Sequence, residues 1–600
     1  MRLFFQRHWV ACTVALAAAF FMVLPQLMYL RALGSDYRGI PRFVDDDAWY
    51  YLVRSREVLD GHPMLGNPYF AEHKDKPTLQ FFLPDVMQAR LLDLLGDDLA
   101  RGMLFVIPLF IALTTLLFYF AVVNLTRSRV AGVLAAAFLF LGMFSRSFNR
   151  PTVPLTITPF WIAEFLLLMA LVRARRRSLA LYAANVAGLG ILFHLYPYFW
   201  SFYLSLIFVL VVLLFLFRRF FTHRHGAGMI ARLWSWFGGV DAESPPSAFG
   251  PKDLLGIAGL ALAIGLPYFL NFWNALQLPE FAETLRRDGA LLSRFPAGIR
   301  VVVPAGVLLL LYATAFRFRA LRWTPEALLA VAGLIAAIGV TNQHIVTAKH
   351  IEPSLHYGDI GILWSTFAAS YLAVRVVSRL RDHWRKASAV AAAVFVTVFV
   401  GYSLVKHVRS YVVVRDDRRS LQGYAPILGE LQRSVSTDDV VFANTTLSEI
   451  IPAYTSANVL FNRNANHFFI SDAEVRDRFL LNHYFDPVDE AYLRRHERSL
   501  WGVQYIDAAG HARQQNKLRR LLGLALVPVP SLPEDEIARA LVRFRELQQG
   551  DFEKELKRYQ VDWLVWDRAR DPSWAAVEDL AFLEKAVVVE DFVVYKVARP

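Results

Sequence analysis

The chain has 600 residues, of which 56% are hydrophobic, 14% are aromatic and only 19% are charged. So apolar a composition over this length excludes a single water-soluble domain and is typical of a membrane protein. The formal net charge of +12 does not indicate a nucleic-acid partner, because most of the excess lies in short loops between apolar runs. The single cysteine, Cys12, excludes an intramolecular disulfide.

The first apolar run extends from His8 to Leu30, is long enough to cross a bilayer, and lacks the small-residue cleavage pattern of a signal peptide. It is therefore predicted to be a retained first span. Ten further apolar segments follow, so the sequence predicts an α-helical polytopic membrane protein with about eleven transmembrane helices. The segments begin near residues 9, 101, 131, 156, 179, 200, 252, 298, 324, 358 and 387.

Every second loop between these segments is strongly basic. By the positive-inside rule the basic loops are cytoplasmic, as is the N-terminus, and an odd number of spans then places the C-terminus outside. The basic loops contain Arg127 and Arg129; Arg173, Arg175, Arg176 and Arg177; Arg218, Arg219 and Arg224; Arg317, Arg319 and Arg322; and Arg379, Arg381, Arg385 and Lys386.

The sequence changes character after about residue 407. Short β-branched runs alternate there with charged helical patterns, which predicts a separate extracytoplasmic α/β domain. The runs are VVFAN at 440, NVLF at 458, VDWLVWD at 561, AVVV at 586 and FVVYKV at 592. We therefore expect a transmembrane domain over residues 1–406, with a long first outside loop at 34–100, and an α/β domain over 407–600. This second domain contains no glycine-rich phosphate loop, CxxC pair or GxSxG motif.

Three adjacent carboxylates, Asp45, Asp46 and Asp47, stand in the first outside loop just before a helical pattern from Ala48 to Leu59. A carboxylate at the N-terminus of that helix would accept backbone N–H bonds and offset the helix dipole. Such capping explains one aspartate and leaves two unexplained.

The stretch Asp47-Ala-Trp-Tyr-Tyr, followed by Arg56-Glu57 and Gly61, resembles the first-loop signature of the GT-C glycosyltransferases. These integral membrane enzymes take a sugar from a polyprenyl phosphate or pyrophosphate carrier, and they include oligosaccharyltransferases, aminoarabinose transferases and protein mannosyltransferases. The resemblance implies an active-site role for Asp47. The later stretch Asp75-Lys76-Pro77 looks like an element of the same loop in aminoarabinose transferases, and implies that Lys76 meets the carrier phosphate.

The chain departs from that family in its second outside loop. Many members carry a second acidic motif there, whereas residues 145–158 contain no carboxylate and Glu164 follows inside the next apolar run. Three explanations are open: Asp45 and Asp46 supply the additional charge, the enzyme works without a second acidic site, or the protein is not catalytically competent.

Glycosyl transfer from a lipid phosphate requires a base for the acceptor and cations or a metal for the leaving phosphate. Asp47, Asp46 and Asp45 are the candidate catalytic carboxylates, and like-charge repulsion among them raises the proton affinity of Asp47. Alternatively, Asp45 and Asp47 could hold Mg²⁺ or Mn²⁺, since both ions prefer oxygen ligands.

Basic residues are disfavoured in outside loops, so those that occur there are candidate phosphate ligands. Any one of them alone could equally be a solvated or headgroup-facing side chain. The cations in these loops are Lys76, Arg146, Arg150, Arg286, Arg287, Arg294 and Lys349. For the lipid phosphate and sugar we select Lys76, Arg150, Arg294, Lys349, His350 and His356. The spacing of six between His344, His350 and His356 does not fit a zinc site.

The sequence therefore predicts a glycosyltransferase of the bacterial cytoplasmic membrane, with a polyprenyl-linked sugar donor and a lipid, glycan or protein acceptor. One alternative is a transporter or flippase for a lipid-linked glycan, which should carry ionisable residues near the midplane of several spans. Apart from Glu164, almost none are evident. The other alternative is a non-catalytic envelope-assembly scaffold, with which the missing second acidic motif agrees.

Overall fold

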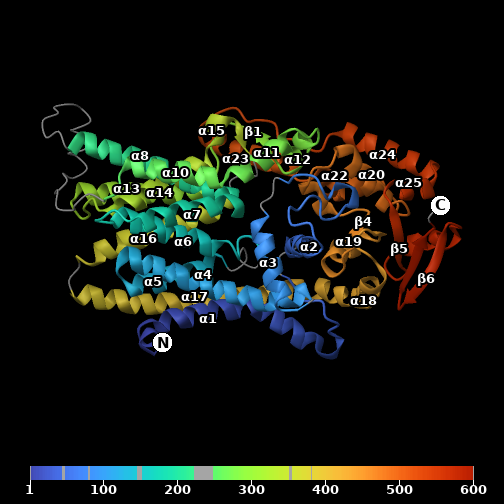
Figure 1. Ribbon diagram of the computed structural model, residues 1–600, viewed down its shortest axis with the longest axis horizontal. Helices are drawn as coiled ribbons and strands as arrows, with labels where there is room; N and C mark the ends of the chain where they lie inside the picture. Colours follow the sequence, from blue (N-terminus) through green and yellow to red (C-terminus); the bar gives the residue numbers. More distant parts are fainter. Residues whose placement is uncertain are drawn as a thin grey trace.

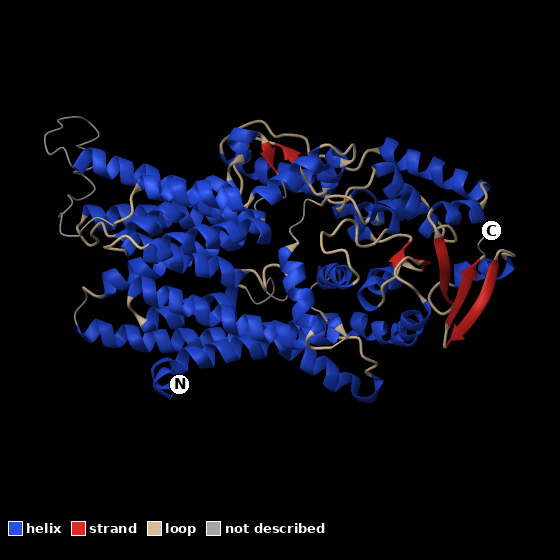
Figure 2. Ribbon diagram, in the orientation of Figure 1, coloured by secondary structure: helices blue, strands red, loops and turns tan. Residues whose placement is uncertain are grey.

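The computed structural model describes residues 2–43, 47–78, 82–96, 98–144, 150, 152–221, 248–350, 355–379 and 382–598. A bundle of long helices and a smaller body that ends in a sheet lie end to end (Figure 1). The strands of that sheet lie at the end of the molecule farthest from the bundle (Figure 2). The protein is thus an α-helical multi-pass membrane protein with a C-terminal α/β domain, as the sequence predicts.

Each of the eleven apolar segments is helical. In two of them the α-helix is interrupted. After Ala136 it continues as a π-helix, and at Gly265 it bends. The elements are α1 (Arg2–Leu33), α4 (Leu99–Thr126), α5 (Arg129–Ala136) with the π-helical η3 (Ala137–Met143), α6 (Thr158–Arg173), α7 (Leu179–Leu195), α8 (Pro197–Phe221), α10 (Pro251–Ile264) with α11 (Leu266–Leu276), α13 (Ile299–Arg317), α14 (Pro325–Thr341), α16 (Leu355–Val377) and α17 (Asp382–Arg419).

Not all of these helices are long enough to cross a bilayer unaided. Among the described residues, 7 helices have the length and hydropathy of a membrane span, and an eighth results if α10 and α11, bent by 56°, count as one. The α5–η3 segment and α7 are apolar but shorter, and α6 has 16 residues. The count of eleven spans stays a prediction.

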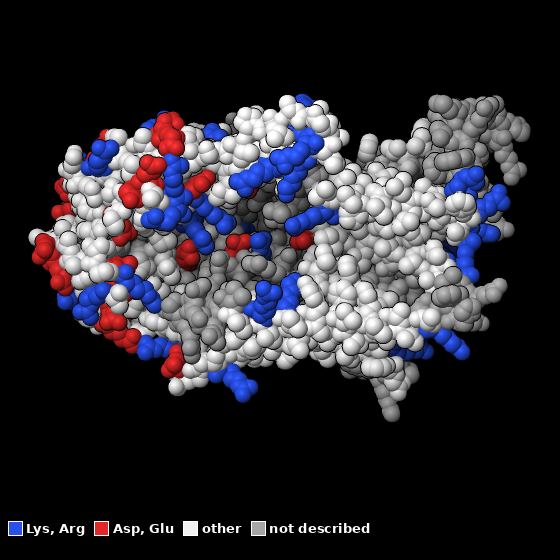
Figure 3. Space-filling view, turned by 180° about the vertical axis from the view of Figure 1, so that it is seen from behind, with Lys and Arg blue, Asp and Glu red and all other residues white. Residues whose placement is uncertain are grey.

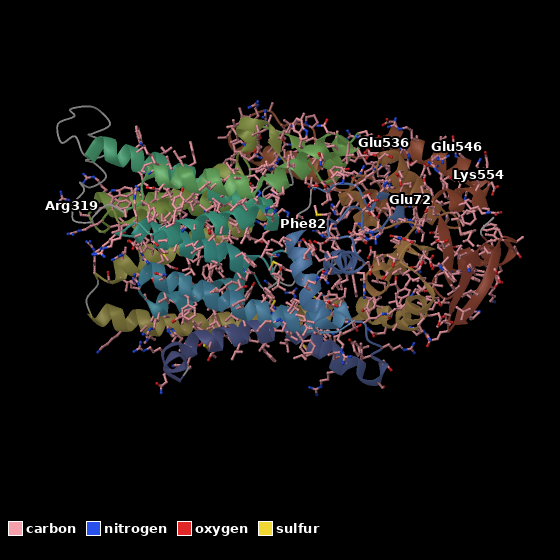
Figure 4. The ribbon with its side chains drawn as sticks, viewed as in Figure 1. Glu72, Phe82, Arg319, Glu536, Glu546 and Lys554 are labelled. Atoms are coloured by element: carbon pink, nitrogen blue, oxygen red, sulfur yellow. The ribbon has the colours of Figure 1, made fainter. Side chains whose placement is uncertain are left out.

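The loops predicted to be cytoplasmic meet one another at one end of the bundle. Arg173 Nε donates to Glu326 Oε1 at 2.6 Å, and Arg177 Nη2 donates to Asp253 Oδ2 at 3.4 Å. Arg319, in another basic loop, lies at the end of the bundle away from the sheet (Figure 4). The loops are therefore sorted as the charge pattern predicts, while the orientation of the chain in the membrane stays a prediction.

The opposite end of the bundle carries short elements that contact the C-terminal domain. They are α2 (Asp47–Leu59), α3 (Leu83–Asp93), α12 (Phe281–Arg287), α15 (His344–Thr347), and the antiparallel pair β1 (Leu291–Leu292) and β2 (Lys349–His350). The predicted helix from Ala48 to Leu59 is confirmed as α2, and ten of its residues are buried. Asp45 and Asp46 lie outside the described residues.

The C-terminal part contains the five predicted strands and eight helices. The sheet has the order β4-β3-β5-β7-β6, in which β4, β3 and β5 are parallel and β7 is antiparallel to both neighbours. The elements are α18 (Ala425–Ser434), β3 (Val440–Phe442), α19 (Thr445–Tyr454), β4 (Asn458–Val459), α20 (Asp472–Asn482), α21 (Glu490–Arg495), α22 (Glu497–Trp501), α23 (Gln504–Leu521), α24 (Glu534–Gln549), α25 (Phe552–Arg558), β5 (Val561–Asp567), β6 (Leu583–Val589) and β7 (Phe592–Val597).

Hydrogen bonds connect the C-terminal domain to the first outside loop. Arg478 Nη2 donates to Glu72 Oε2 at 2.8 Å, and the backbone N–H of Val459 donates to the carbonyl of Tyr69 at 2.9 Å. The helix α17 runs through position 407 without a break, so the division of the chain at 406 and 407 stays a prediction. These contacts fix the loop that carries Asp47 between the bundle and the C-terminal domain.

Candidate active site at the mouth of the helix bundle

The position of Asp47 is set by a buried ion pair further along α2. Arg54 Nη2 donates to Asp85 Oδ2 of α3 at 2.6 Å, and both side chains are 0% exposed. Arg54 Nη1 also donates to Tyr50 Oη at 2.8 Å. Removal of one partner of such a pair typically costs about 3–5 kcal/mol, because the other charge is left buried and unpaired. The helix is therefore rigidly held, and its first residue has a defined place.

Asp47 forms an ion pair with Arg150, which lies in the segment just before α6. Asp47 Oδ2 and Arg150 Nη2 are 3.0 Å apart, and the side chains are 39% and 31% exposed. Both residues are sequence-predicted candidates, and both are accessible to a ligand. A guanidinium has five N–H donors, so Arg150 can hold Asp47 and a phosphate oxygen together.

Tyr51 lies one helical turn after Asp47, beside this ion pair. Burial raises the pKa of the Tyr51 phenol, although the nearby Arg150 opposes that effect. The hydroxyl group is therefore neutral at physiological pH and is available as a hydrogen-bond donor. Tyr51 is not among the sequence-predicted candidates.

His356, another candidate, lies in the first turn of α16. Its Nδ1 is 2.5 Å from the hydroxyl of Tyr196, at the turn between α7 and α8, and its ring stacks on Tyr198 with centroids 4.7 Å apart. These contacts fix the imidazole against the outer ends of two other helices. Near the same turn, the Phe82 ring packs edge-on against His194 with centroids 6.3 Å apart, and Phe82 lies between the bundle and the C-terminal domain (Figure 4).

A second carboxylate near Arg150 was missed by the sequence analysis. Asp359 follows His356 by three residues, which puts both on one face of α16, and its charge interacts with His356 and Arg150. A carboxylate at the end of an apolar run is uncommon and usually functional, so this rule, applied to the apolar segment that begins near residue 358, would have identified Asp359. We call the group Asp47, Tyr51, Arg150, Tyr196, His356 and Asp359 the mouth cluster.

Lys76 lies elsewhere in the first loop. Its Nζ donates to Glu280 Oε1 and to the carbonyl of Phe469, each at 3.0 Å. The ammonium group thus joins the first loop to the segment before α12 and to the C-terminal domain. Its predicted contact with a carrier phosphate stays a prediction.

Three further candidates gather around β1 and β2. Arg294 Nη1 donates to the carbonyls of Ile345 and Val346 at 2.8 and 3.1 Å. Lys349 is exposed, whereas His350 is buried against His344 and His511, with ring centroids 4.2 and 5.3 Å away. This second group forms part of the contact with α23 of the C-terminal domain.

Two other cations of the outside loops have carboxylate partners. Arg286 and Arg287 both bond to Asp472 of the C-terminal domain. Arg146 lies outside the described residues. Of the predicted cations, Arg150 is therefore the one that the described contacts bring to Asp47.

The described residues do not fit a Mg²⁺ or Mn²⁺ site. No group of three or more His, Cys, Asp or Glu side chains suited to a metal occurs in the part of the chain that the structure describes. The Asp47 carboxylate already contacts a guanidinium, whose charge opposes a second cation there. Asp45, the predicted partner of Asp47 in a metal site, lies outside the described residues, so that pairing stays a prediction.

The surface between the two bodies is hollowed. Figure 3 shows this hollow with Lys and Arg side chains gathered around it and several acidic side chains within it. The helical body beyond it is almost free of charge until its far end. A basic rim beside an apolar body suits an anionic headgroup on an apolar chain.

Comparison with known proteins gives similarity of fold only. No protein-family model matches the chain, and no curated protein matches it. Among solved structures, the chain is similar to ArnT from Cupriavidus metallidurans bound to undecaprenyl phosphate, with 15% identity, 96% of this chain and 97% of that chain covered, and a TM-score of 0.42.

Two structures of the oligosaccharyltransferase of Archaeoglobus fulgidus are also similar. One is tethered to an acceptor peptide containing the NVT sequon, with 12% identity, 94% of this chain and 69% of that chain covered, and a TM-score of 0.38. The other is a complex with Zn and sulfate, with 13% identity, 92% and 68% covered, and a TM-score of 0.30. At these values the likeness is one of overall arrangement, and the site depends on this chain's own residues.

Proposed function

We propose that this protein is a glycosyltransferase that moves a sugar from a polyprenyl phosphate or pyrophosphate carrier to an acceptor at the outer face of the bacterial cytoplasmic membrane. The observation that carries the proposal is the 3.0 Å ion pair between Asp47, in the stretch that resembles the GT-C first-loop signature, and Arg150. In this orientation the N-terminus is cytoplasmic and residues 407–600 are outside.

The mouth cluster can perform the chemistry of this transfer. As the bond between the sugar's anomeric carbon and the phosphate oxygen breaks, the departing phosphate gains negative charge, which the Arg150 guanidinium stabilises through several N–H donors. Tyr51 and His356 lie beside it as further hydrogen-bonding groups. A carboxylate of the cluster accepts the proton of the incoming nucleophile.

Arg150 and His356 are the phosphate and sugar ligands in this proposal. The other selected residues have protein partners or lie on the second group around β1 and β2, and their roles at the donor stay sequence predictions. They are Lys76, Arg294, Lys349 and His350. The donor class depends on the first-loop motif and on the mouth cluster, not on the similarity of fold.

The direct test is turnover by the purified full-length protein with short-chain polyprenyl phosphate and pyrophosphate sugars, with and without Mn²⁺. We expect release of the polyprenyl carrier by the wild type and a loss of at least about 100-fold in Asp47→Asn, the usual scale for a residue of this kind. Asp93→Asn is the matched control, since this carboxylate is 56% exposed on α3.

The outcome also separates the competing functions. If the wild type turns over none of these donors, the glycosyltransferase proposal is wrong and the scaffold alternative is favoured. If Asp47→Asn is as active as the wild type, the mouth cluster is not the active site.

A further inference from the structure

The two carboxylates of the mouth cluster differ in how they are engaged. Asp47 is bonded to Arg150 at 3.0 Å. Asp359 is half-buried, and within the described part of the chain no hydrogen bond or ion pair reaches its carboxylate. The charged groups that face it are His356 on its own helix and Arg150 from the segment before α6. Arg150 therefore bonds to the carboxylate of Asp47 and lies near a second carboxylate, Asp359, to which it does not bond.

This difference assigns different chemistry to the two residues. The Arg150 guanidinium bonds to one carboxylate oxygen of Asp47, which occupies a position that an acceptor's proton would need. The Asp359 carboxylate, to which no described donor bonds, has its oxygens available for such a proton, as a general base requires. We propose that Asp359 is the general base of the transfer reaction and that Asp47 positions Arg150 for the departing phosphate.

The surroundings of Asp359 support this role. The imidazole one turn before it is fixed by the hydroxyl of Tyr196 at 2.5 Å and by the ring of Tyr198. The hydroxyl of Tyr357, the residue after that imidazole, is 2.8 Å from Ser201 Oγ of α8. The first turn of α16 is thus anchored, and the carboxylate has a defined place near Arg150. Asp359 also provides the second acidic residue that residues 145–158 lack.

The inference rests on the proposed function, in which a sugar passes from the lipid phosphate to an acceptor. The acceptor's O–H or N–H proton passes to a carboxylate oxygen of Asp359, and the acceptor atom bonds to the anomeric carbon. The bond from that carbon to the phosphate oxygen breaks, and its electron pair leaves with the phosphate, which Arg150 holds. Asp359 then returns the proton to water at the open mouth. With water as the acceptor, the same step hydrolyses the donor.

Hydrolysis allows a test that needs no knowledge of the natural acceptor. Full-length wild type, Asp359→Asn, Asp359→Glu, Asp47→Asn and the control Asp93→Asn are assayed with a short-chain polyprenyl phosphate sugar over a range of pH. Binding of the sugar-free polyprenyl phosphate is measured in parallel.

For Asp359→Asn we expect kcat to fall at least about 100-fold and the decline of rate at acidic pH to disappear, since no base remains to be protonated. Its affinity for polyprenyl phosphate should stay within about twofold of the wild type. Asp359→Glu should keep the acidic decline at a shifted pH. Asp47→Asn should instead bind polyprenyl phosphate more weakly, because Arg150 loses its positioning partner.

Unchanged kcat and an unchanged acidic decline in Asp359→Asn would overturn the assignment, and so would loss of that decline in Asp47→Asn alone. If Asp359→Asn does not fold, Asp359→Glu decides: a shifted decline supports the assignment and an unshifted one overturns it. A wild type without turnover overturns the proposed function and this inference together, whereas an active wild type with an unaffected Asp359→Asn overturns this inference alone.

Discussion

At the scale of single residues, the geometry of Arg150 is the property that the proposed site uses. A guanidinium presents a planar fork that matches two phosphate oxygens, whereas an ammonium group is a point charge. In Arg150→Lys we expect the positive charge to remain and the affinity for polyprenyl phosphate to fall about 10-fold, equivalent to about 1.4 kcal/mol.

Equilibrium binding of polyprenyl phosphate measures this effect. The matched control is Arg90→Lys, because Arg90 is 66% exposed on α3 and its contact with Asp93 is a surface pair. Equal affinity in Arg150→Lys and the wild type would show that the phosphate does not meet this side chain.

The residues of the site were only partly predictable from the sequence. Asp47 follows from a local motif, and Arg150 follows from its unfavourable charge in an outside loop. Asp359 was missed because the search for a second carboxylate covered only the second outside loop. The partner of Lys76, Glu280, is 204 residues away along the chain, and only the fold brings them together.

At the scale of elements, the contact between β2 and α23 contains an unusual set of histidines. His350 is 3% exposed, and its imidazole lies between His344 of α15 and His511 of α23. Burial, followed by the proximity of the other two histidines, lowers the pKa of His350 to about 4. Burial also lowers the pKa of His511, whose Nε2 is 2.8 Å from Ser293 Oγ.

These pKa values predict a pH-dependent stability. The pKa of His350 in the folded protein lies below the value of about 6.5 in an unfolded chain, so the unfolded chain binds more protons between these values. The stabilisation is complete above about pH 6.5 and is lost as the pH falls toward 4. We expect the free energy of unfolding to fall by about 1–3 kcal/mol as the pH falls across this window.

Thermal unfolding of the full-length protein at several pH values measures the loss. His350→Gln should flatten the pH dependence, since glutamine does not titrate, while His194→Gln serves as the control at a half-buried histidine outside this cluster. A wild type whose unfolding temperature is the same at both ends of the window would contradict the prediction.

The helices and strands were more predictable from the sequence than the order of the strands in the sheet. The apolar runs and the β-branched runs identified all eleven helical segments and all five strands of the main sheet, because both signals are local. The order β4-β3-β5-β7-β6 is not local, since β3 and β5 are adjacent in the sheet but separated by more than a hundred residues. The break at Gly265 between α10 and α11 was likewise not predicted.

At the scale of the whole molecule, Arg478 is one of the residues that join the C-terminal domain to the first outside loop. It donates to Glu72 at 2.8 Å, and its guanidinium stacks on Phe70 and Tyr559 with separations of 4.1 and 4.3 Å. The side chain is 1% exposed. Its removal leaves the partly exposed carboxylate of Glu72 without its cation and two rings without their partner.

For Arg478→Ala we therefore expect the loss of about 1–3 kcal/mol of stability and faster proteolysis within residues 60–78. Limited proteolysis followed by mass spectrometry locates the cleavage. Arg539→Ala is the control, since that arginine is 56% exposed on α24. Equal protection of the first loop in Arg478→Ala and the wild type would show that the loop is ordered without the Arg478 side chain.

The bond between Arg478 and Glu72 also has a consequence for biogenesis, because its two residues are 406 positions apart. A ribosome that adds about 5–20 residues per second needs about 20–80 s to travel from one to the other. During this interval the nascent first loop is without the surface that later covers it, and is accessible to chaperones and proteases. The first loop should therefore reach its final packing only when the last third of the polypeptide is being made.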